Sequence, residues 1–252
     1  MANMAVIEKA YDTIYDYLMN KSPNKEGYKQ LLERDVKVSD GIYLEDASLY
    51  GTLLDLREAI REATAKSSGT QNVRKVMQDI LKYSEKSGRQ LFLQKAYKDD
   101  DGYTMVCDSY RFVRTKDNVD LPLLDEKRDG KWIDWKRIVP DVNERREVKL
   151  PSVSEIKEFI KLNKNNRQYL DNKKLVYVLK NDNGEAIAAF DAKWLKGLIE
   201  AVGDEAKGYV SDKKARINPM VIVNGDTICL ICPIRLEKSH YDFRWEDDIV
   251  EA

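Results

Sequence analysis

Two cysteines three residues apart, Cys229 and Cys232, have the C-x-x-C spacing found in zinc sites and redox-active dithiols. They lie in the apolar run ICLICPI, and the sequence holds no second cysteine or histidine pair to complete a metal site. Residues i and i+3 of a strand point to opposite faces, so the two thiols of a strand would diverge. We therefore interpret both as small buried side chains and expect no bound metal or other cofactor.

Other patterns of catalytic chemistry are weak or absent in the sequence. Residues 99–102, DDDG, lack the spaced ligands and terminal Glu of a calcium-binding loop, so a solvated turn is expected. No phosphate-binding loop, serine-hydrolase elbow or zinc-protease motif occurs, and the single histidine, His240, has no obvious Ser or Cys partner. The sequence therefore predicts that the protein is not an enzyme. A cleft of converging carboxylates without a motif is the alternative.

The overall composition limits which kinds of partner and which cellular compartment fit the sequence. The 252 residues leave room for one or two domains, and 43 Lys and Arg nearly balance 44 Asp and Glu. Any contact with nucleic acid must therefore come from a local basic patch. Three cysteines cannot form a disulfide framework, which favours a reducing, cytoplasmic location. No apolar run approaches the roughly 20 residues of a membrane span, and the first residues lack the apolar core of a signal peptide.

Hydrophobic periodicity and turn residues predict the elements of the first 151 residues. The polar stretch SSG at residues 67–69 is a candidate boundary between two parts. The expected elements are, in order, a helix at 4–20, strand-like residues at 35–50, a helix at 53–66, a helix at 72–86, strands at 90–97 and 103–114, and an irregular connection at 117–151.

The remaining residues predict the order β-α-β-β-α-β-β-β. Asn183-Gly184 and Asn224-Gly225 are hairpin dipeptides, and Asp191 is a candidate helix N-cap. No long alternation of strands and helices with glycine-rich loops occurs, so an α+β protein with antiparallel hairpins is expected. The expected elements are strands at 147–150, 174–180, 185–190, 208–211, 217–223 and 227–236, and helices at 154–164 and 192–202.

Three of these helices, at 72–86, 154–164 and 192–202, pair an apolar face with a lysine-bearing face. Lysines on such faces suit contacts to phosphates that do not read bases. The alternative is that they are ordinary solvated lysines. The lysines in question are Lys75, Lys82, Lys86, Lys157, Lys161, Lys164, Lys193 and Lys196.

Several segments, in order, resemble the bacterial DNA polymerase III beta subunit, the sliding clamp. Residues 103–112, YTMVCDSYRF, resemble the family's strand that ends in Ala-Thr-Asp and continues to an Arg, and residues 130–140, GKWIDWKRIVP, resemble its interdomain segment. Residues 218–236 resemble its last hairpin, which ends in Arg-Leu, and residues 190–195, FDAKWL, resemble the opening of the last domain's second helix. The resemblance covers residues 70–236.

The resemblance implies clamp-like domains with helices on one side of antiparallel sheets. It divides the chain into an irregular N-terminal α+β domain at 1–140, clamp-like from about residue 70, a clamp-like domain at 141–236 and a tail at 237–252. The family has three such domains, whereas this chain has room for two at most, so a divergent and shortened member is expected, with host and phage origin as open alternatives. Two domains per chain imply a homo-oligomer, and the analogy with the two-domain clamps of archaea and eukaryotes implies a trimer.

The resemblance also implies a function in DNA replication. The eight helix lysines would contact double-stranded DNA non-specifically, and a pocket would bind peptides of polymerases or clamp loaders. The tail at 237–252 would cover this pocket. Tyr110 and Phe112 are equally consistent with core or cross-strand positions. The alternative function is a clamp-fold protein-interaction module that does not encircle DNA. The matching pocket residues are Ser109, Tyr110, Arg111, Pro233, Ile234 and Leu236.

Overall fold

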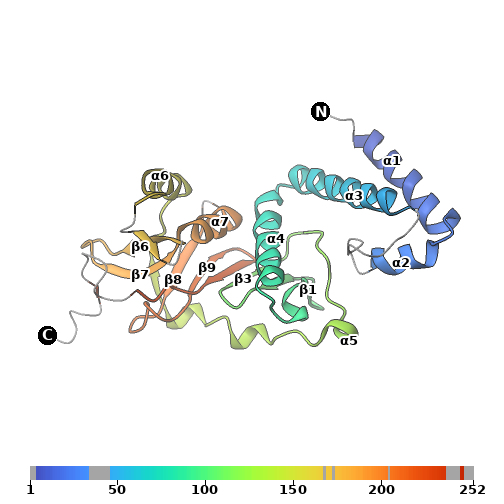
Figure 1. The fold of residues 1–252 in the computed structure, drawn as a ribbon. Coiled ribbons are helices and arrows are strands. Elements are labelled where there is room, and N and C mark those ends of the chain that lie inside the picture. The colour runs from blue at the N-terminus through green and yellow to red at the C-terminus, as the bar shows by residue number, and fades with distance from the viewer. Residues whose placement is uncertain are drawn as a thin grey trace. The chain divides into compact units, whose positions relative to one another are not determined.

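The computed structural model describes residues 4–33, 46–166, 169–171, 174–203, 205–236 and 245–246 (Figure 1). The chain divides into two compact units, Met1–Gln71 and Asn72–Ala252, next to the expected boundary at 67–69. Among the described residues, no helix is both long and apolar enough to cross a bilayer.

The first unit consists of helices around a small aromatic core. Helix α1 (Met4–Asp16) runs into a π-helical turn (Tyr17–Lys21), and α2 (Lys25–Glu33) and α3 (Ala47–Ser67) follow. The rings of Tyr28 and Tyr50 stack with centroids 5.4 Å apart, and Leu18 and Leu53 are buried beside them. These residues form a hydrophobic core whose members all come from the first unit.

The expected strand at 35–50 is wrong in its last residues. Residues 34–45 lie outside the described part of the chain, and Ala47 already opens helix α3. The reason is that Tyr50 and Leu53, three residues apart, lie on one buried helical face. The helix expected at 53–66 is confirmed and begins six residues earlier.

The second unit opens with α4 (Gln71–Lys86), as expected, followed by a 3₁₀ turn (Leu91–Leu93), β1 (Tyr97–Lys98), β2 (Thr104–Cys107) and β3 (Arg111–Thr115). The strand expected at 90–97 is therefore wrong except for its last residue, Tyr97. The single strand expected at 103–114 is wrong, because a turn divides it into the β2–β3 hairpin. The carboxylate of Asp108 accepts the backbone N–H groups of Tyr110 (2.9 Å) and Arg111 (2.7 Å), while Ser109 takes a positive φ of 74°. A local side-chain hydrogen bond therefore overrides a continuous apolar pattern.

The expected irregular connection is confirmed between β3 and the next strand. It holds only α5 (Glu126–Asp129) and 3₁₀ turns at Trp135–Arg137 and Val142–Glu144. An aspartate precedes each of these three turns and accepts the backbone N–H two residues further on. The ring of Trp132 stacks on Tyr97 at 5.5 Å and fastens the connection to the sheet.

The C-terminal half follows the expected order with one extra short strand, β5. Strand 227–236 is shorter than expected because it ends at Ile231, before Pro233, which lacks a backbone N–H. Ser152 and Glu155 form a capping box, and the carboxylate of Asp191 accepts two backbone N–H groups at the next helix. The elements are β4 (Arg146–Val148), α6 (Val153–Asn163), β5 (Leu170–Asp171), β6 (Lys174–Lys180), β7 (Ala186–Asp191), α7 (Ala192–Val202), β8 (Lys207–Val210), β9 (Met220–Asn224) and β10 (Thr227–Ile231).

The strands of this unit form two sheets in which all pairs of named strands are antiparallel. A seven-stranded sheet has the order β1-β2-β3-β10-β9-β8-β4, and a three-stranded sheet has the order β5-β6-β7. The α+β class is therefore confirmed. The larger sheet spans both sides of residue 140 through the β3–β10 pair, and the domain boundary expected at 140/141 stays a prediction.

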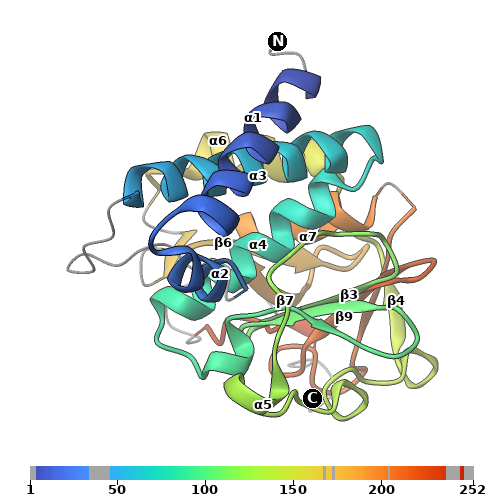
Figure 2. The ribbon, with the colours of Figure 1, turned by 90° about the vertical axis from the view of Figure 1, so that its right-hand side faces the viewer.

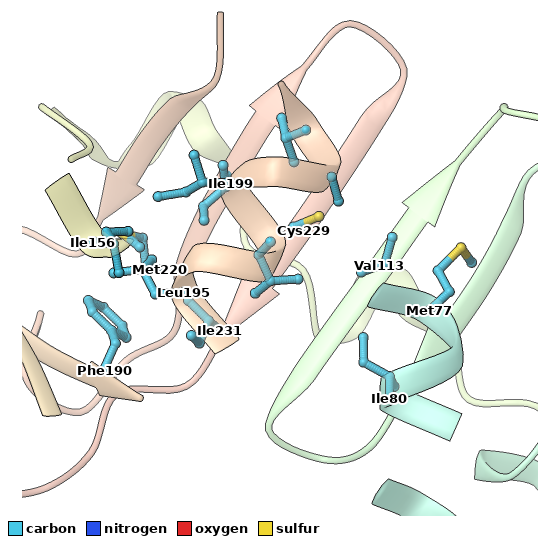
Figure 3. Packing of buried hydrophobic residues seen from close by; sticks show 14 of the residues in the cluster. Met77, Ile80, Val113, Ile156, Phe190, Leu195, Ile199, Met220, Cys229 and Ile231 are labelled. Atoms are coloured by element: carbon cyan, nitrogen blue, oxygen red, sulfur yellow. The ribbon is translucent and has the colours of Figure 1, made fainter. Parts of the chain in front are cut away.

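Helices α4, α6 and α7 cover these sheets. Val113 of β3 and Cys229 of β10 are cross-strand partners in one core with α4 and α7, so both helices lie on the same side of the larger sheet (Figure 2). Ile156 of α6 and Leu195 of α7 pack with Phe190 of β7 (Figure 3). Helix α7 thus contacts both sheets. The strands beneath α6 and α7 therefore form two sheets and not one continuous layer.

We expect Leu195→Ala to lower the free energy of unfolding by about 2–5 kcal/mol, because Leu195 is fully buried and its loss leaves a cavity. Urea denaturation followed by tryptophan fluorescence measures it, since all four tryptophans lie in the second unit. Leu162→Ala on α6 is the matched control. Its side chain is 72% exposed, so a change of about 0.5 kcal/mol or less is expected. Equal losses in both variants would contradict this packing.

Candidate functional site

The eight predicted lysines lie on the three helices of the second unit, opposite the buried faces. Three are on α4, three on or next to α6 and two on α7. Seven of them are exposed, and only Lys196 is half-buried. Helices α4 and α7 approach closely: a Cβ at Gly197 would lie 3.4 Å from the Cγ2 of Val76. Since α6 packs against α7, the three lysine-bearing helices form one layer, called here the helix layer.

Glu200 of α7 holds two of these lysines in ion pairs. Its carboxylate lies 2.9 Å from the Nζ of Lys157 on α6 and 3.0 Å from the Nζ of Lys196 on its own helix. Partial burial works to raise the pKa of Glu200, but hydrogen bonds and positive charge from Lys157 and Lys196 outweigh it, so the pKa is lowered. Glu200 is therefore ionised at neutral pH, and it links α6 to α7 while neutralising part of the basic surface.

A small cavity of about 200 Å³ lies beside the helix layer. Its wall holds three lysines from three elements and one buried aspartate. Lys174, which opens β6, was missed by the sequence reasoning because it lies on no helical face. The lining residues are Ile160, Lys164, Leu170, Lys174, Leu175, Asp191 and Lys193.

Arg111, a residue of the predicted peptide site, is buried and only 2% exposed. Its guanidinium donates to the carboxylates of Asp108 (2.8 Å) and Asp79 (2.6 Å). The same group lies 4.3 Å from the centre of the Trp194 ring. Arg111 therefore joins β3 to α4 and α7 with its charge already paired, which is how a buried arginine becomes tolerable.

Tyr110, by contrast, is 39% exposed and belongs to an aromatic surface. Its ring lies 6.1 Å from Trp194 and 6.2 Å from Tyr83. Cations border it: the Nζ of Lys174 is 5.5 Å and the guanidinium of Arg89 is 5.3 Å from the Tyr110 ring. We call these five residues the Tyr110 surface. The core alternative holds for Phe112, which is buried, and not for Tyr110.

The other predicted peptide-site residues divide between two places. The backbone N–H of Cys232 donates to the carbonyl of Tyr110 (2.8 Å), which sets Ser109 and Tyr110 beside the segment that holds Pro233. Ile234 and Leu236 instead pack with Trp245 of the tail. The structure therefore brings the main chains together but turns Ile234 and Leu236 toward a second cluster. Of the tail at 237–252, only Trp245 and Glu246 are described, and Trp245 belongs to the cluster on which Ile234 and Leu236 pack. That the tail covers the peptide pocket stays a prediction.

The cysteines lie in apolar surroundings. Burial raises the pKa of the Cys107 thiol to about 11 and raises the pKa values of Cys229 and Cys232 as well, so all three are protonated at neutral pH. Within the part of the chain that the structure describes, no group of three His, Cys, Asp or Glu side chains is placed to hold a metal ion.

Comparison with known proteins gives matches to solved structures only. No family model and no curated protein matches the chain. The DNA polymerase III beta subunit of Borrelia burgdorferi, solved with a natural product, is 14% identical with a TM-score of 0.45, and the match covers 67% of this chain and 63% of that one. The Helicobacter pylori beta clamp bound to a DNA ligase peptide is 13% identical with a TM-score of 0.43, covering 65% and 62%.

A DNA polymerase III beta subunit from Streptococcus pneumoniae is 13% identical with a TM-score of 0.41, and the match covers 65% of this chain and 63% of that one. The chain thus spans less than two thirds of the length of each of these clamps. The chain is thus similar to bacterial DNA polymerase III beta sliding clamps, at low identity and over part of its length.

Proposed function

We propose that the chain is a sliding-clamp-like, non-enzymatic DNA-replication protein that contacts duplex DNA without reading its sequence. The observation that carries the proposal is the helix layer, because seven exposed lysines lie on one layer of a chain whose net charge is only −1. Lysine is a flexible point charge that suits phosphate contacts and discriminates poorly between bases. Such contacts hold DNA and still permit movement along it.

The Tyr110 surface supports the peptide-binding part of the proposal. Its exposed ring offers apolar contact area, and Lys174 and Arg89 beside it offer positive charge. A polymerase or clamp-loader peptide with an apolar side chain next to an acidic one fits that combination. Homo-oligomerisation, up to a ring of three copies around the DNA, and a cytoplasmic location belong to the same proposal.

A second function, a protein-interaction module that does not encircle DNA, is favoured by Glu200. Lys157 and Lys196 are engaged by this carboxylate. In such a module the lysines would serve to solubilise the surface, and DNA affinity would be absent or independent of the helix layer. The two functions therefore differ in how salt and the helix-layer lysines affect DNA association.

Replacing Lys161, Lys164 and Lys193 together by Gln tests the helix layer. We expect weaker binding to a duplex of arbitrary sequence, with the slope of log K against log [KCl] reduced by roughly 2 to 3, since each phosphate contact contributes about 0.9. Fluorescence anisotropy across a KCl series measures this slope. The control variant replaces Lys127, Lys180 and Lys207, which are exposed elsewhere in the same unit, and removes equal charge. Equal losses in both variants, or no binding by the parent chain, would reject the DNA function.

Glu200→Gln tests the same two functions by freeing lysines of the helix layer instead of removing them. Loss of the carboxylate releases Lys157 and Lys196, so the DNA function predicts roughly two- to tenfold tighter duplex binding at low salt. Glu147→Gln is the control, because it removes the same charge and releases Lys207 on the β4–β8 strand pair instead. If both variants bind DNA as the parent does, the interaction module gains support.

The depressed pKa of Glu200 predicts how the α6–α7 link depends on pH. The ionised carboxylate is favoured in the folded state, so its stabilisation is fully present above the ordinary Glu pKa of 4.5 and is lost as pH falls through the lower folded-state pKa. We expect Glu200→Gln to melt below the parent at pH 7, and the difference between the two to shrink as pH falls below 4.5. Thermal melting by circular dichroism checks this, and a constant difference across the range would contradict it.

A further inference from the structure

The outer face of the three-stranded sheet, turned away from the helix layer, carries a second apolar surface. Val176 of β6 and Ala186 and Ala189 of β7 are buried there together, because a register shift between Leu179 and Lys180 leaves an extra, unpaired residue in β7 between Ala186 and Ala188. The indole of Trp245 packs on them and is only 5% exposed. We call this the outer surface. In the part of the chain that the structure describes, Trp245, Ile234 and Leu236 pack on its apolar part.

An arginine and an amide bind Glu246, the residue that follows the tryptophan. Both carboxylate oxygens of Glu246 accept hydrogen bonds from Arg146, at 3.0 and 2.5 Å, and one also accepts from the amide of Asn181 at 3.1 Å. The guanidinium of Arg216 lies 4.9 Å from the Trp245 ring centre. Bidentate arginine contacts recognise a carboxylate specifically, so the outer surface selects an acidic residue directly after an aromatic one.

The backbone of β7 adds a third element of recognition. β6 pairs with one side of β7, and on the other side Trp245 forms a parallel bridge with Ala186. The backbone N–H of Ile234 donates to the carbonyl of Ala189 at 2.7 Å along the same strand. A strand edge that pairs with an added extended segment is a known mode of peptide capture, in which pockets for side chains supply the specificity.

We propose that the outer surface is a binding site for an extended peptide of a partner protein in which an aromatic residue directly precedes a carboxylate. Trp245–Glu246 is its resident occupant in this chain, and the partner peptide displaces it. The charges agree with this assignment, because residues 237–252 contain six Asp and Glu against two Lys and Arg, and the surface presents Arg146 and Arg216. This site is separate from the Tyr110 surface and does not depend on DNA binding.

The resident occupant makes the intact chain a weak binder of such peptides. A ligand tethered to its own site competes at an effective concentration of about millimolar, so an external peptide binds strongly only when the tether is released or the resident side chains are removed. The outer surface is thus masked, and release of Trp245 exposes it.

The test uses the full-length chain with Trp245→Ala and Glu246→Ala, which vacate the surface. The probe is a fluorescent peptide of residues 241–250, YDFRWEDDIV, and anisotropy measures its binding. We expect the vacated chain to bind the probe at least about tenfold more tightly than the intact chain. A probe carrying Trp245→Ala should lose most of this affinity. A folded vacated chain that does not bind the probe overturns the proposal.

Two further variants keep the test specific. Arg146→Gln in the vacated chain should weaken probe binding about tenfold through loss of the bidentate contact, whereas Arg137→Gln, an exposed arginine of the connection, should leave it unchanged. If the vacated chain does not fold, the single variant Glu246→Gln replaces it. We then expect an intermediate gain in probe affinity, and no gain would overturn the proposal.

Light scattering tests whether a second copy of this chain occupies the outer surface. If the intact chain is a dimer and Trp245→Ala converts it to a monomer, the occupant is a second copy, and the proposal of a partner peptide is overturned. Duplex binding is measured in parallel, so this result and that of the DNA function stay distinguishable.

Discussion

Burial of helix α7 between two separate sheets is the constraint on which the second unit depends. The apolar side of this helix contacts β6 and β7 of the small sheet and β9 and β10 of the large one. Leu195 and Leu198 are fully buried in the shared core. Asp191 caps the start of the helix and Gly203, with a φ of 91°, ends it, so its length matches the surface that it covers. The lysines of α6 and α7 can share one layer only because this helix holds the two sheets together.

Electrostatics distinguishes the surfaces of this unit more sharply than composition does. The helix layer is basic, and Glu200 neutralises part of its positive charge. The buried Arg111 has its charge paired with Asp79 and Asp108. On the outer surface, Arg146 faces the carboxylate of Glu246. Burial tends to raise the pKa of Glu246, but the hydrogen bonds of Arg146 and Asn181 outweigh it, so this pKa is lowered. A chain of almost zero net charge therefore carries local fields of definite sign.

Local signals in the sequence were sufficient for most helices and hairpins of the second unit. The period of apolar residues located α4, and Asn224-Gly225 and Asp191 located a hairpin and a cap. The turn at Asp108 was missed because it depends on a side-chain hydrogen bond and a positive φ at Ser109, which periodicity does not detect. Lys174 and Trp245 acquire their roles from residues distant in the sequence, so nothing in their own neighbourhoods indicated them. The roles predicted for the lysines and for the peptide-site residues stay predictions.

The β3–β10 pair has a mechanical consequence for any larger assembly. Four consecutive residue pairs, from Arg114↔Ile228 to Arg111↔Ile231, join strands that lie on either side of the irregular connection. Bending the unit at that connection would require breaking this ladder, so the two sides of the connection move as one body. In an assembly of several copies, any adjustment of angle would therefore have to occur at the joints between copies.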